Sequence, residues 1–277
     1  MRLEYLVDAV TMPIKDYLMY LGLSRRLARK IKLYGKMYVN NQEALNYHLV
    51  KKGDVLVLEY NETLNQEIVA SQTSLEILYE DESLLVVNKP HDLAIQPSRR
   101  HQEDNLISRI KAVFVHKAIT SNIHIVNRLD YSTSGLVLVA KNGFVHHQLT
   151  SKNRILKKYQ AIVEGKLAEQ VGTIHLPIAR LVEYDIKRGV SELGKKAITH
   201  YRVMEESDKT SLLELILETG RTHQIRVHMA YIGHPIVGDK LYGKDDQRLY
   251  LHCYYMEFIH PQTNEKIVLT KESQWNV

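Results

Sequence analysis

The hydrophobic positions in the first sixty residues predict two short helices. Residues 16–18 and a stop at Gly22 indicate the first, and Ser24 can cap a second helix over 25–33 that ends at Gly35. On this second helix the apolar side chains recur at helical spacing, so we expect one buried stripe and an outward face of arginines and lysines. The stripe consists of Leu27, Ile31 and Tyr34.

Short strand-like segments follow these helices. Residues 37–39 precede an Asn40-Asn41 turn, and residues 55–59 form an apolar run after Gly53-Asp54. Two helices and a small sheet predict a compact α/β module over residues 1–62. The polar stretch 61–73 has no hydrophobic period and is expected to be a linker.

Beyond residue 73 the pattern becomes rich in strands. Expected strands lie at 75–79, 84–88, 123–126, 136–140, 159–164, 199–204 and 212–218, and expected helices at 105–116, 144–149 and 222–232. Strands outnumber helices here without a regular alternation of the two. Residues 74–277 are therefore expected to form an α+β domain on a mixed, mostly antiparallel sheet.

Composition places the chain among folded proteins of a reducing compartment. Of its 277 residues, 44% are hydrophobic and 25% are charged. The longest apolar run, 136–140, is too short to cross a bilayer, and the first residues show no signal-peptide pattern, so a cytoplasmic protein with no membrane partner is expected. The single cysteine, Cys253, excludes a disulfide framework within the chain and a cysteine-rich zinc site.

Positive charge is concentrated in two short runs, within a formal net charge of +5. The first run lies on the second predicted helix and contains no acidic residue. Each run could be an ordinary solvated surface, but two of them favour a nucleic-acid partner. The basic residues are Arg25, Arg26, Arg29, Lys30, Lys32 and Lys36 in the first run and Lys152, Arg154, Lys157 and Lys158 in the second.

The segment 125–142 carries the most chemical information. Asp130 stands at the mouth of a short turn rich in threonine, serine and glycine, between two apolar strands. A rigid scaffold of this kind can present a carboxylate to a cleft. Alternatively, Asp130 organises the turn by accepting hydrogen bonds from the amides of Ser132 or Thr133.

Four stretches, taken in order, resemble the RluA-type RNA pseudouridine synthases. They are Arg128-Leu129-Asp130 with Thr133-Ser134-Gly135, the earlier Asn88-Lys89-Pro90, the later Lys158-Tyr159-Gln160-Ala161, and the segment 219–230 followed by 233–239. The first sixty residues resemble the S4-type RNA-binding module in the run 24–40 and in Gly53-Asp54.

The resemblance implies an enzyme that converts particular uridines of structured RNA to pseudouridine without a cofactor. It implies that Asp130, Tyr159 and Arg226 are catalytic, with Arg226 pairing the carboxylate and Tyr159 stacking on the uracil. Arg128 would fill the gap left by the everted nucleotide, and the other substrate-binding positions are Thr133, Arg221, His223 and Gln224. The last three could hold a phosphate at a helix start or simply cap that helix. The RNA-binding surface is expected to comprise Arg25, Arg26, Arg29, Lys30 and Lys158.

Three positions depart from the family pattern. Asn127 replaces a histidine, Asp92 a glycine, and Gln96 a histidine before Pro97. They keep a second hypothesis open, an RNA-binding or ribosome-assembly factor that has the fold but lost the chemistry. Replacing Asp130 by asparagine would discriminate the two.

The sequence supports no metal or nucleotide cofactor. The histidines lack the paired spacing of zinc hydrolases, and no phosphate-binding glycine loop is present. A hydrolase would need a second carboxylate or a nucleophile–base pair beside Asp130, and the motifs show none. Ribosomal RNA is favoured over transfer RNA as the substrate, and a monomer is expected.

Overall fold

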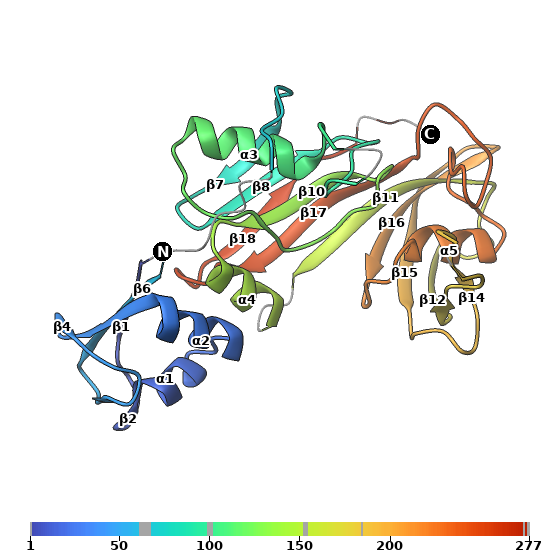
Figure 1. Ribbon diagram of the computed structural model, residues 1–277. Helices are drawn as coiled ribbons and strands as arrows, with labels where there is room; N and C mark the ends of the chain where they lie inside the picture. Colours follow the sequence, from blue (N-terminus) through green and yellow to red (C-terminus); the bar gives the residue numbers. More distant parts are fainter. Residues whose placement is uncertain are drawn as a thin grey trace.

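The N-terminal sixty residues form a small sheet with two helices beside it (Figure 1). The computed structural model describes residues 2–60, 68–98, 102–151, 155–183, 185–273 and 275. The sheet has the order β1-β6-β3-β4, and α2 packs on β3 and β6. The elements are β1 (Arg2–Leu6), β2 (Met12–Pro13), α1 (Ile14–Tyr20), α2 (Arg25–Tyr34), β3 (Gly35–Val39), β4 (Gln42–Glu43), β5 (Leu49–Val50) and β6 (Val55–Tyr60), with β2 paired to β5.

Helix α2 begins where the sequence predicts. The Ser24 hydroxyl accepts a hydrogen bond from the Leu27 amide at 3.1 Å, which satisfies one of the free donors of the first turn. Leu27 and Ile31 are buried as expected, but the prediction for Tyr34 is wrong, because its ring is 74% exposed. Tyr34 is the last helical residue before the chain turns into β3, so the helical period no longer directs its side chain inward.

The second part of the chain is built on one long sheet with the order β12-β15-β16-β11-β17-β10-β8-β7, with β18 beside β17 and β9 beside β10. Every described pair is antiparallel except β10 with β17, which confirms the α+β class with a mixed, mostly antiparallel sheet. The strands are β7 (Glu76–Glu80), β8 (Leu84–Lys89), β9 (His124–Ile125), β10 (Ser134–Ala140), β11 (Leu156–Glu164), β12 (Val171–His175), β15 (Ile198–Glu206), β16 (Thr210–Leu217), β17 (Leu251–Ile259) and β18 (Lys266–Thr270).

Three helices and a small hairpin complete this domain. Figure 1 shows α3 over the β7 and β8 end of the sheet and α5 beside β12 and β15 at the other end. The core lies where β8 and β10 pair, since Leu84–Val87 and Leu136–Ala140 are all fully buried. The remaining elements are α3 (Leu106–His116), α4 (Gly143–Ser151), α5 (Gln224–Tyr231), β13 (Ile178–Ala179) and β14 (Gly189–Val190).

Two boundaries near the Asp130 motif differ from the sequence expectation. Ser134 and Gly135 belong to β10 rather than to the turn before it, and α5 begins at Gln224 rather than at Thr222. Strand β17, which the sequence analysis did not predict, lies in the centre of the sheet. No described helix is both long enough and apolar enough to span a bilayer.

Candidate active site

The parallel contact between β10 and β17 brings the Asp130 turn to the centre of the sheet. Gly135 pairs with Cys253 at a φ of +119°, and a Cβ atom there would lie 2.3 Å from the Cys253 carbonyl oxygen. Cys253 in turn pairs with Tyr159 of β11, next to a bulge in that strand. Glycine is thus required for the close approach that sets the Asp130 turn beside Tyr159.

Arg226 of α5 links Asp130 to a second, buried carboxylate. Its Nε and Nη2 atoms donate to the two oxygens of Asp239 at 2.8 and 2.6 Å, while its Nη1 lies 4.0 Å from Asp130 Oδ2. Burial opposes the charge on the guanidinium, but Asp239, aided by Asp130, raises the pKa of Arg226. The bidentate pair with Asp239 therefore fixes Arg226. The remaining edge of its charged guanidinium faces Asp130.

Asp130 and Tyr159 face one cleft of about 500 Å³. The Asp130 side chain is 30% exposed, so its carboxylate is reachable, while Tyr159 is only 6% exposed. Burial, the neighbouring Cys253 and the Asp130 charge together raise the pKa of the Tyr159 hydroxyl well above its usual value. Tyr159 is consequently a neutral phenol at physiological pH.

Some of the predicted substrate-binding residues line the cleft without a partner in the protein, and others form hydrogen bonds within the protein. Arg128 lines the cleft, is exposed, and has no acidic partner in the described part of the chain. Thr133 lines it too, and its buried hydroxyl has no hydrogen-bond partner among the described residues. Both are available to a substrate.

Gln224 and His223 are largely occupied by the protein. The buried Gln224 side chain accepts from the Arg221 amide at 3.0 Å and donates to the Ile198 carbonyl at 2.9 Å. His223 precedes α5 in the left-handed region, at a φ of 58°, and its Nδ1 lies 2.8 Å from the Tyr242 hydroxyl. Burial lowers the pKa of His223 despite the nearby Asp130 charge.

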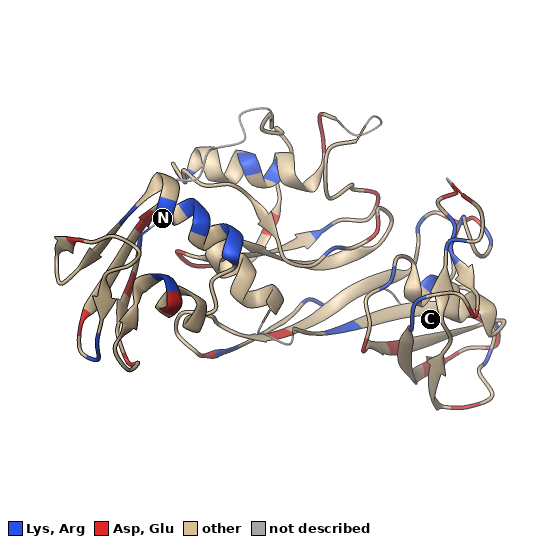
Figure 2. Cartoon of the chain, turned by 60° about the horizontal axis from the view of Figure 1, so that its bottom comes forward, with Lys and Arg blue, Asp and Glu red and all other residues tan. Residues whose placement is uncertain are grey.

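The basic residues also differ in availability. The predicted RNA-binding residues of α2 are exposed, and Figure 2 shows basic residues along that helix. Lys158 instead pairs with Glu214 at 3.2 Å, whereas Lys157 lines the cleft with Tyr159. Alternate strand residues share a face, so the Lys157 side chain could have been chosen from the sequence. Lys152 and Arg154 lie outside the described residues.

Lys89 is a support of the site that the sequence analysis did not single out. It is fully buried, and its Nζ donates to the carbonyls of Pro90, Leu93 and Tyr131 at 2.9–3.0 Å. These bonds tie the loop after β8 to the residue next to Asp130. The Asn88-Lys89-Pro90 stretch was the available signal.

The departures from the family pattern fit their surroundings. The buried Asn127 side chain donates to the Leu136 carbonyl at 3.2 Å and accepts from the Leu138 amide at 2.7 Å, which fastens the turn to β10. Asp92 has a φ of 54°, a conformation that suits the glycine it replaces, and Gln96 is exposed. The hydrogen bonds of Asn127 to β10 therefore hold in place the turn that carries Asp130.

Asp130 is the carboxylate of the cleft that lies beside Arg226. Glu218 is a second carboxylate in the lining, but its Oε1 lies 2.8 Å from His200 Nε2. Within the described residues, no group of three or more His, Cys, Asp or Glu side chains could hold a metal ion. Asp130 can act as a nucleophile or as a base beside a cation and a phenol.

Comparison with known proteins connects this geometry to a family. A family model described as RNA pseudouridylate synthase matches residues 83–231. The uncharacterized RNA pseudouridine synthase YjbO of Bacillus subtilis (strain 168) is 40% identical over 264 residues, covering 92% of this chain and 93% of its own. The ribosomal large subunit pseudouridine synthase D of Pseudomonas aeruginosa is 36% identical over 265 residues, covering 87% and 81%. The solved structure of human RNA pseudouridylate synthase domain containing 1 has a TM-score of 0.61 and 28% identity, covering 76% of this chain and 86% of its own.

Proposed function

Because the chain belongs to the RNA pseudouridylate synthase family and is an isomerase acting on RNA, we propose that it modifies uridines of large-subunit ribosomal RNA with Asp130 as the reacting carboxylate. The choice of ribosomal RNA is supported by the relative named ribosomal large subunit pseudouridine synthase D. The observation that carries the role of Asp130 is its position: partly exposed in a cleft, with Arg226 at 4.0 Å and Tyr159 in the same lining.

The reaction rearranges one nucleoside and needs no other reactant. The N1–C1′ bond breaks, the uracil turns, C5 joins C1′, and the C5 proton leaves while N1 gains one. A carboxylate beside the sugar can attack carbon or remove a proton, and Arg226 keeps Asp130 oriented. Both roles for Asp130 use the same geometry.

The other residues receive roles from their surroundings. Tyr159 offers a ring for the uracil to stack on, and because a neutral phenol is a weak base, its hydroxyl would relay the C5 proton rather than hold it. The uridine must leave its stack to reach the cleft, at a cost of a few kcal/mol, and Arg128 would fill its place. The unpartnered Thr133 hydroxyl would bond the nucleotide.

The N-terminal module of residues 1–62 is assigned to RNA binding as an S4-type unit. Its support is the layout of two helices and a small sheet with the exposed residues Arg25, Arg26, Arg29 and Lys30 on α2. Lys158 is left out of this surface because it pairs with Glu214. The cytoplasmic location, the monomeric state and the absence of a cofactor stay predictions.

A binding protein that has lost the chemistry is not favoured. Asp130, Tyr159 and Arg226 are all retained, and Asn127 supports the turn in place of the family histidine. The presence of all three residues in one lining supports catalysis over binding alone.

The test compares two cleft carboxylates. Wild type, Asp130→Asn and Glu218→Gln are incubated with large-subunit ribosomal RNA transcribed in vitro, and pseudouridine is mapped by carbodiimide modification and primer extension. We expect Asp130→Asn to lose more than about 10²-fold in rate while still binding RNA, and Glu218→Gln to stay near wild type. Modification by the asparagine variant at the wild-type rate would disprove the role of Asp130. A wild type that binds the transcript but leaves it unmodified would disprove the choice of substrate.

A further inference from the structure

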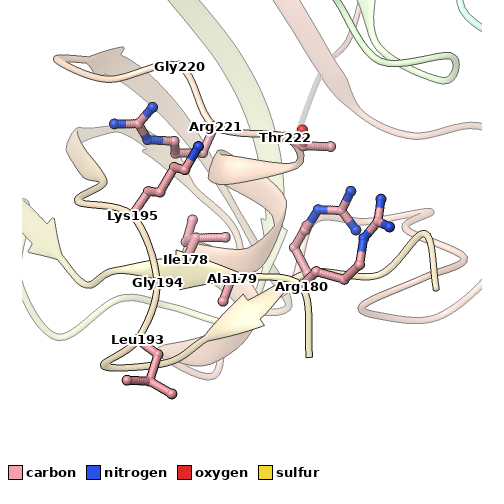
Figure 3. A pocket seen from close by; sticks show the side chains of 10 residues that line it. Ile178, Ala179, Arg180, Leu193, Gly194, Lys195, Gly220, Arg221 and Thr222 are labelled. Atoms are coloured by element: carbon pink, nitrogen blue, oxygen red, sulfur yellow. The ribbon is translucent and has the colours of Figure 1, made fainter. Parts of the chain in front are cut away.

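A second pocket, of about 440 Å³, adjoins the Asp130 cleft. Four basic side chains line it, and we call it the four-cation pocket: Arg180, Arg188, Lys195 and Arg221. Figure 3 shows Lys195 and Arg221 lying together on one side of it and Arg180 on the other. The cations thus come from the β13–β14 region and from the loop before α5, and they converge on one space.

The charges in this pocket are not balanced by the protein. Its lining contains no acidic residue, and none of the four cations has an ion pair within the described residues. Like charges gathered around one space repel each other, so an anion bound there would relieve the repulsion. Arg180, Lys195 and Arg221 are exposed, so an anionic ligand can reach them from solvent.

Two of the four side chains are already held in place. Arg188 Nη1 donates to the carbonyls of Asp185, Ile186 and Lys187 at 2.9–3.1 Å, and Arg221 Nε donates to the Lys196 carbonyl at 2.9 Å. Each guanidinium keeps further N–H donors for a ligand. Less conformational entropy is lost on binding when the donors are fixed beforehand.

The pocket is joined to the cleft by a shared wall. Gly220, Arg221 and Thr222 line both spaces. The Arg188 amide donates to the Tyr242 hydroxyl, which lies 2.8 Å from Nδ1 of His223, a residue that lines the cleft. An anion in the pocket would therefore sit next to a nucleotide in the cleft.

We propose that the four-cation pocket binds a backbone phosphate of the RNA strand next to the uridine that enters the Asp130 cleft. The inference rests on the proposed function and names the part of the substrate that this surface receives. A phosphodiester carries the negative charge that the four cations require, and it is linked covalently to the nucleotide in the cleft. Such contacts fix the register of the strand and carry no base information.

The test removes two cations from the pocket and, as a control, two exposed cations that do not line it. Arg180→Ala/Lys195→Ala is compared with Lys196→Ala/Lys209→Ala, whose residues are exposed and do not line the pocket. The affinity for a fluorescein-labelled twelve-nucleotide oligouridylate is measured by anisotropy between 50 and 200 mM salt. Each phosphate neutralised on single-stranded RNA contributes about 0.7 to the salt slope, so a pocket variant that no longer holds its one phosphate should have a slope smaller by about 0.7. Wild type would then lose about 2.6-fold more affinity than this variant across that range, and the control would follow wild type.

Equal slopes for the two double variants would overturn the inference, as would a wild type that does not bind oligouridylate at 50 mM salt. Inorganic phosphate is the second probe. Stabilisation of wild type but not of the pocket variant by millimolar phosphate, with unchanged RNA slopes, would make the pocket a site for a small anion and also overturn the inference.

Pseudouridine formation on the ribosomal transcript separates this inference from the proposed function. The pocket variant should need more RNA to reach half of its maximal single-turnover rate, with that maximal rate unchanged. If the pocket variant binds RNA less tightly but wild type makes no pseudouridine, the inference about the pocket is supported and the proposed function is contradicted. If the pocket variant binds and modifies RNA as wild type does, the proposed function is supported and the inference about the pocket is contradicted.

Discussion

Arg226 is fixed by hydrogen bonds to one carboxylate and lies beside a second one. Its two short bonds go to Asp239, which is fully buried and also accepts from the amides of Leu241 and Tyr242 at 3.0 and 3.2 Å. Asp130 lies farther away, at 4.0 Å, and keeps its exposure to the cleft. We propose Asp130 as the reacting carboxylate, and a carboxylate that also had to anchor the arginine would lose that freedom. Asp239 therefore performs the anchoring.

Lys89 gives a prediction of pH dependence. Burial lowers its pKa to about 7 from an ordinary value of 10.5, against the opposing influence of Asp130 and Asp92. Above pH 7 the folded protein gives up this proton while the unfolded chain keeps it, so stability should rise with pH until the unfolded lysine also titrates. Relative to Lys89→Met, wild type should gain about 2–3 kcal/mol of unfolding free energy between pH 7 and pH 9.

Urea unfolding of both proteins at several pH values measures this gain. The methionine variant loses the hydrogen bonds of Lys89 to three carbonyls, and methionine does not titrate, so the pH slope of the difference reports the titration of Lys89. Lys141→Met is the matched control, since its buried ammonium pairs with Glu80. Parallel pH profiles for wild type and Lys89→Met would contradict the prediction.

At the level of elements, the contact between β10 and β17 depends on Gly135. Alanine there would need a φ of +119° and would place its Cβ 2.3 Å from the Cys253 carbonyl oxygen. Gly135→Ala should therefore destabilise the fold by about 3 kcal/mol or more and displace the Asp130 turn. Gly220→Ala is the control, because no atom lies within 4 Å of its Cβ position and its φ is ordinary.

Thermal unfolding and pseudouridine formation are measured together on these two variants. We expect Gly135→Ala to lose both stability and activity and Gly220→Ala to retain its stability; because Gly220 lines the cleft, the Gly220 variant is a control for stability alone. A stable Gly135→Ala protein with normal activity would show that β10 and β17 need not approach so closely.

The sequence predicted the elements with strong local patterns and missed those defined by pairing. Helix α3 and strand β10 were expected near their observed positions; a continuous apolar run marks β10, and in the structure Asn105 caps α3. Strand β17 was missed although its aromatic residues favour a strand, because the polar residues His252 and Glu257 interrupt its apolar pattern. Its parallel pairing with β10 is long-range and leaves no local signal.

The same distinction applies to the site. Asp130, Tyr159 and Arg226 were found through motifs, since each stands in a recognisable run. Asp239 and Lys89 lie in quoted runs too, but their partners are distant in sequence, 13 residues away for Asp239 and up to 42 for Lys89. Tyr34 shows the opposite error, because a regular period was extended to a residue where the helix ends.

At the scale of the whole molecule, the N-terminal module touches the catalytic part through aromatic side chains. Tyr5 of β1 packs edge-on against Phe144 of α4, with ring centroids 6.1 Å apart. Tyr5 is largely buried, and burial raises the pKa of its hydroxyl. This contact joins the module to the long sheet, and we propose that the α2 cations and the cleft bind the same RNA.

The α2 cations give the last prediction. Arg26→Ala/Arg29→Ala should weaken RNA binding and lower its salt slope by about 1.8 on a structured transcript, because each phosphate contact to a duplex contributes about 0.9. Lys15→Ala/Lys52→Ala removes the same charge from exposed positions of the same module outside α2 and should change the slope little.

Because α2 does not line the cleft, the maximal single-turnover rate of pseudouridine formation should stay at the wild-type value in both variants. Filter binding and rapid quench on the ribosomal transcript measure these quantities. Equal slopes for the two variants would make the α2 cations an ordinary solvated face, whereas a reduced maximal rate would mean that the module also shapes the cleft.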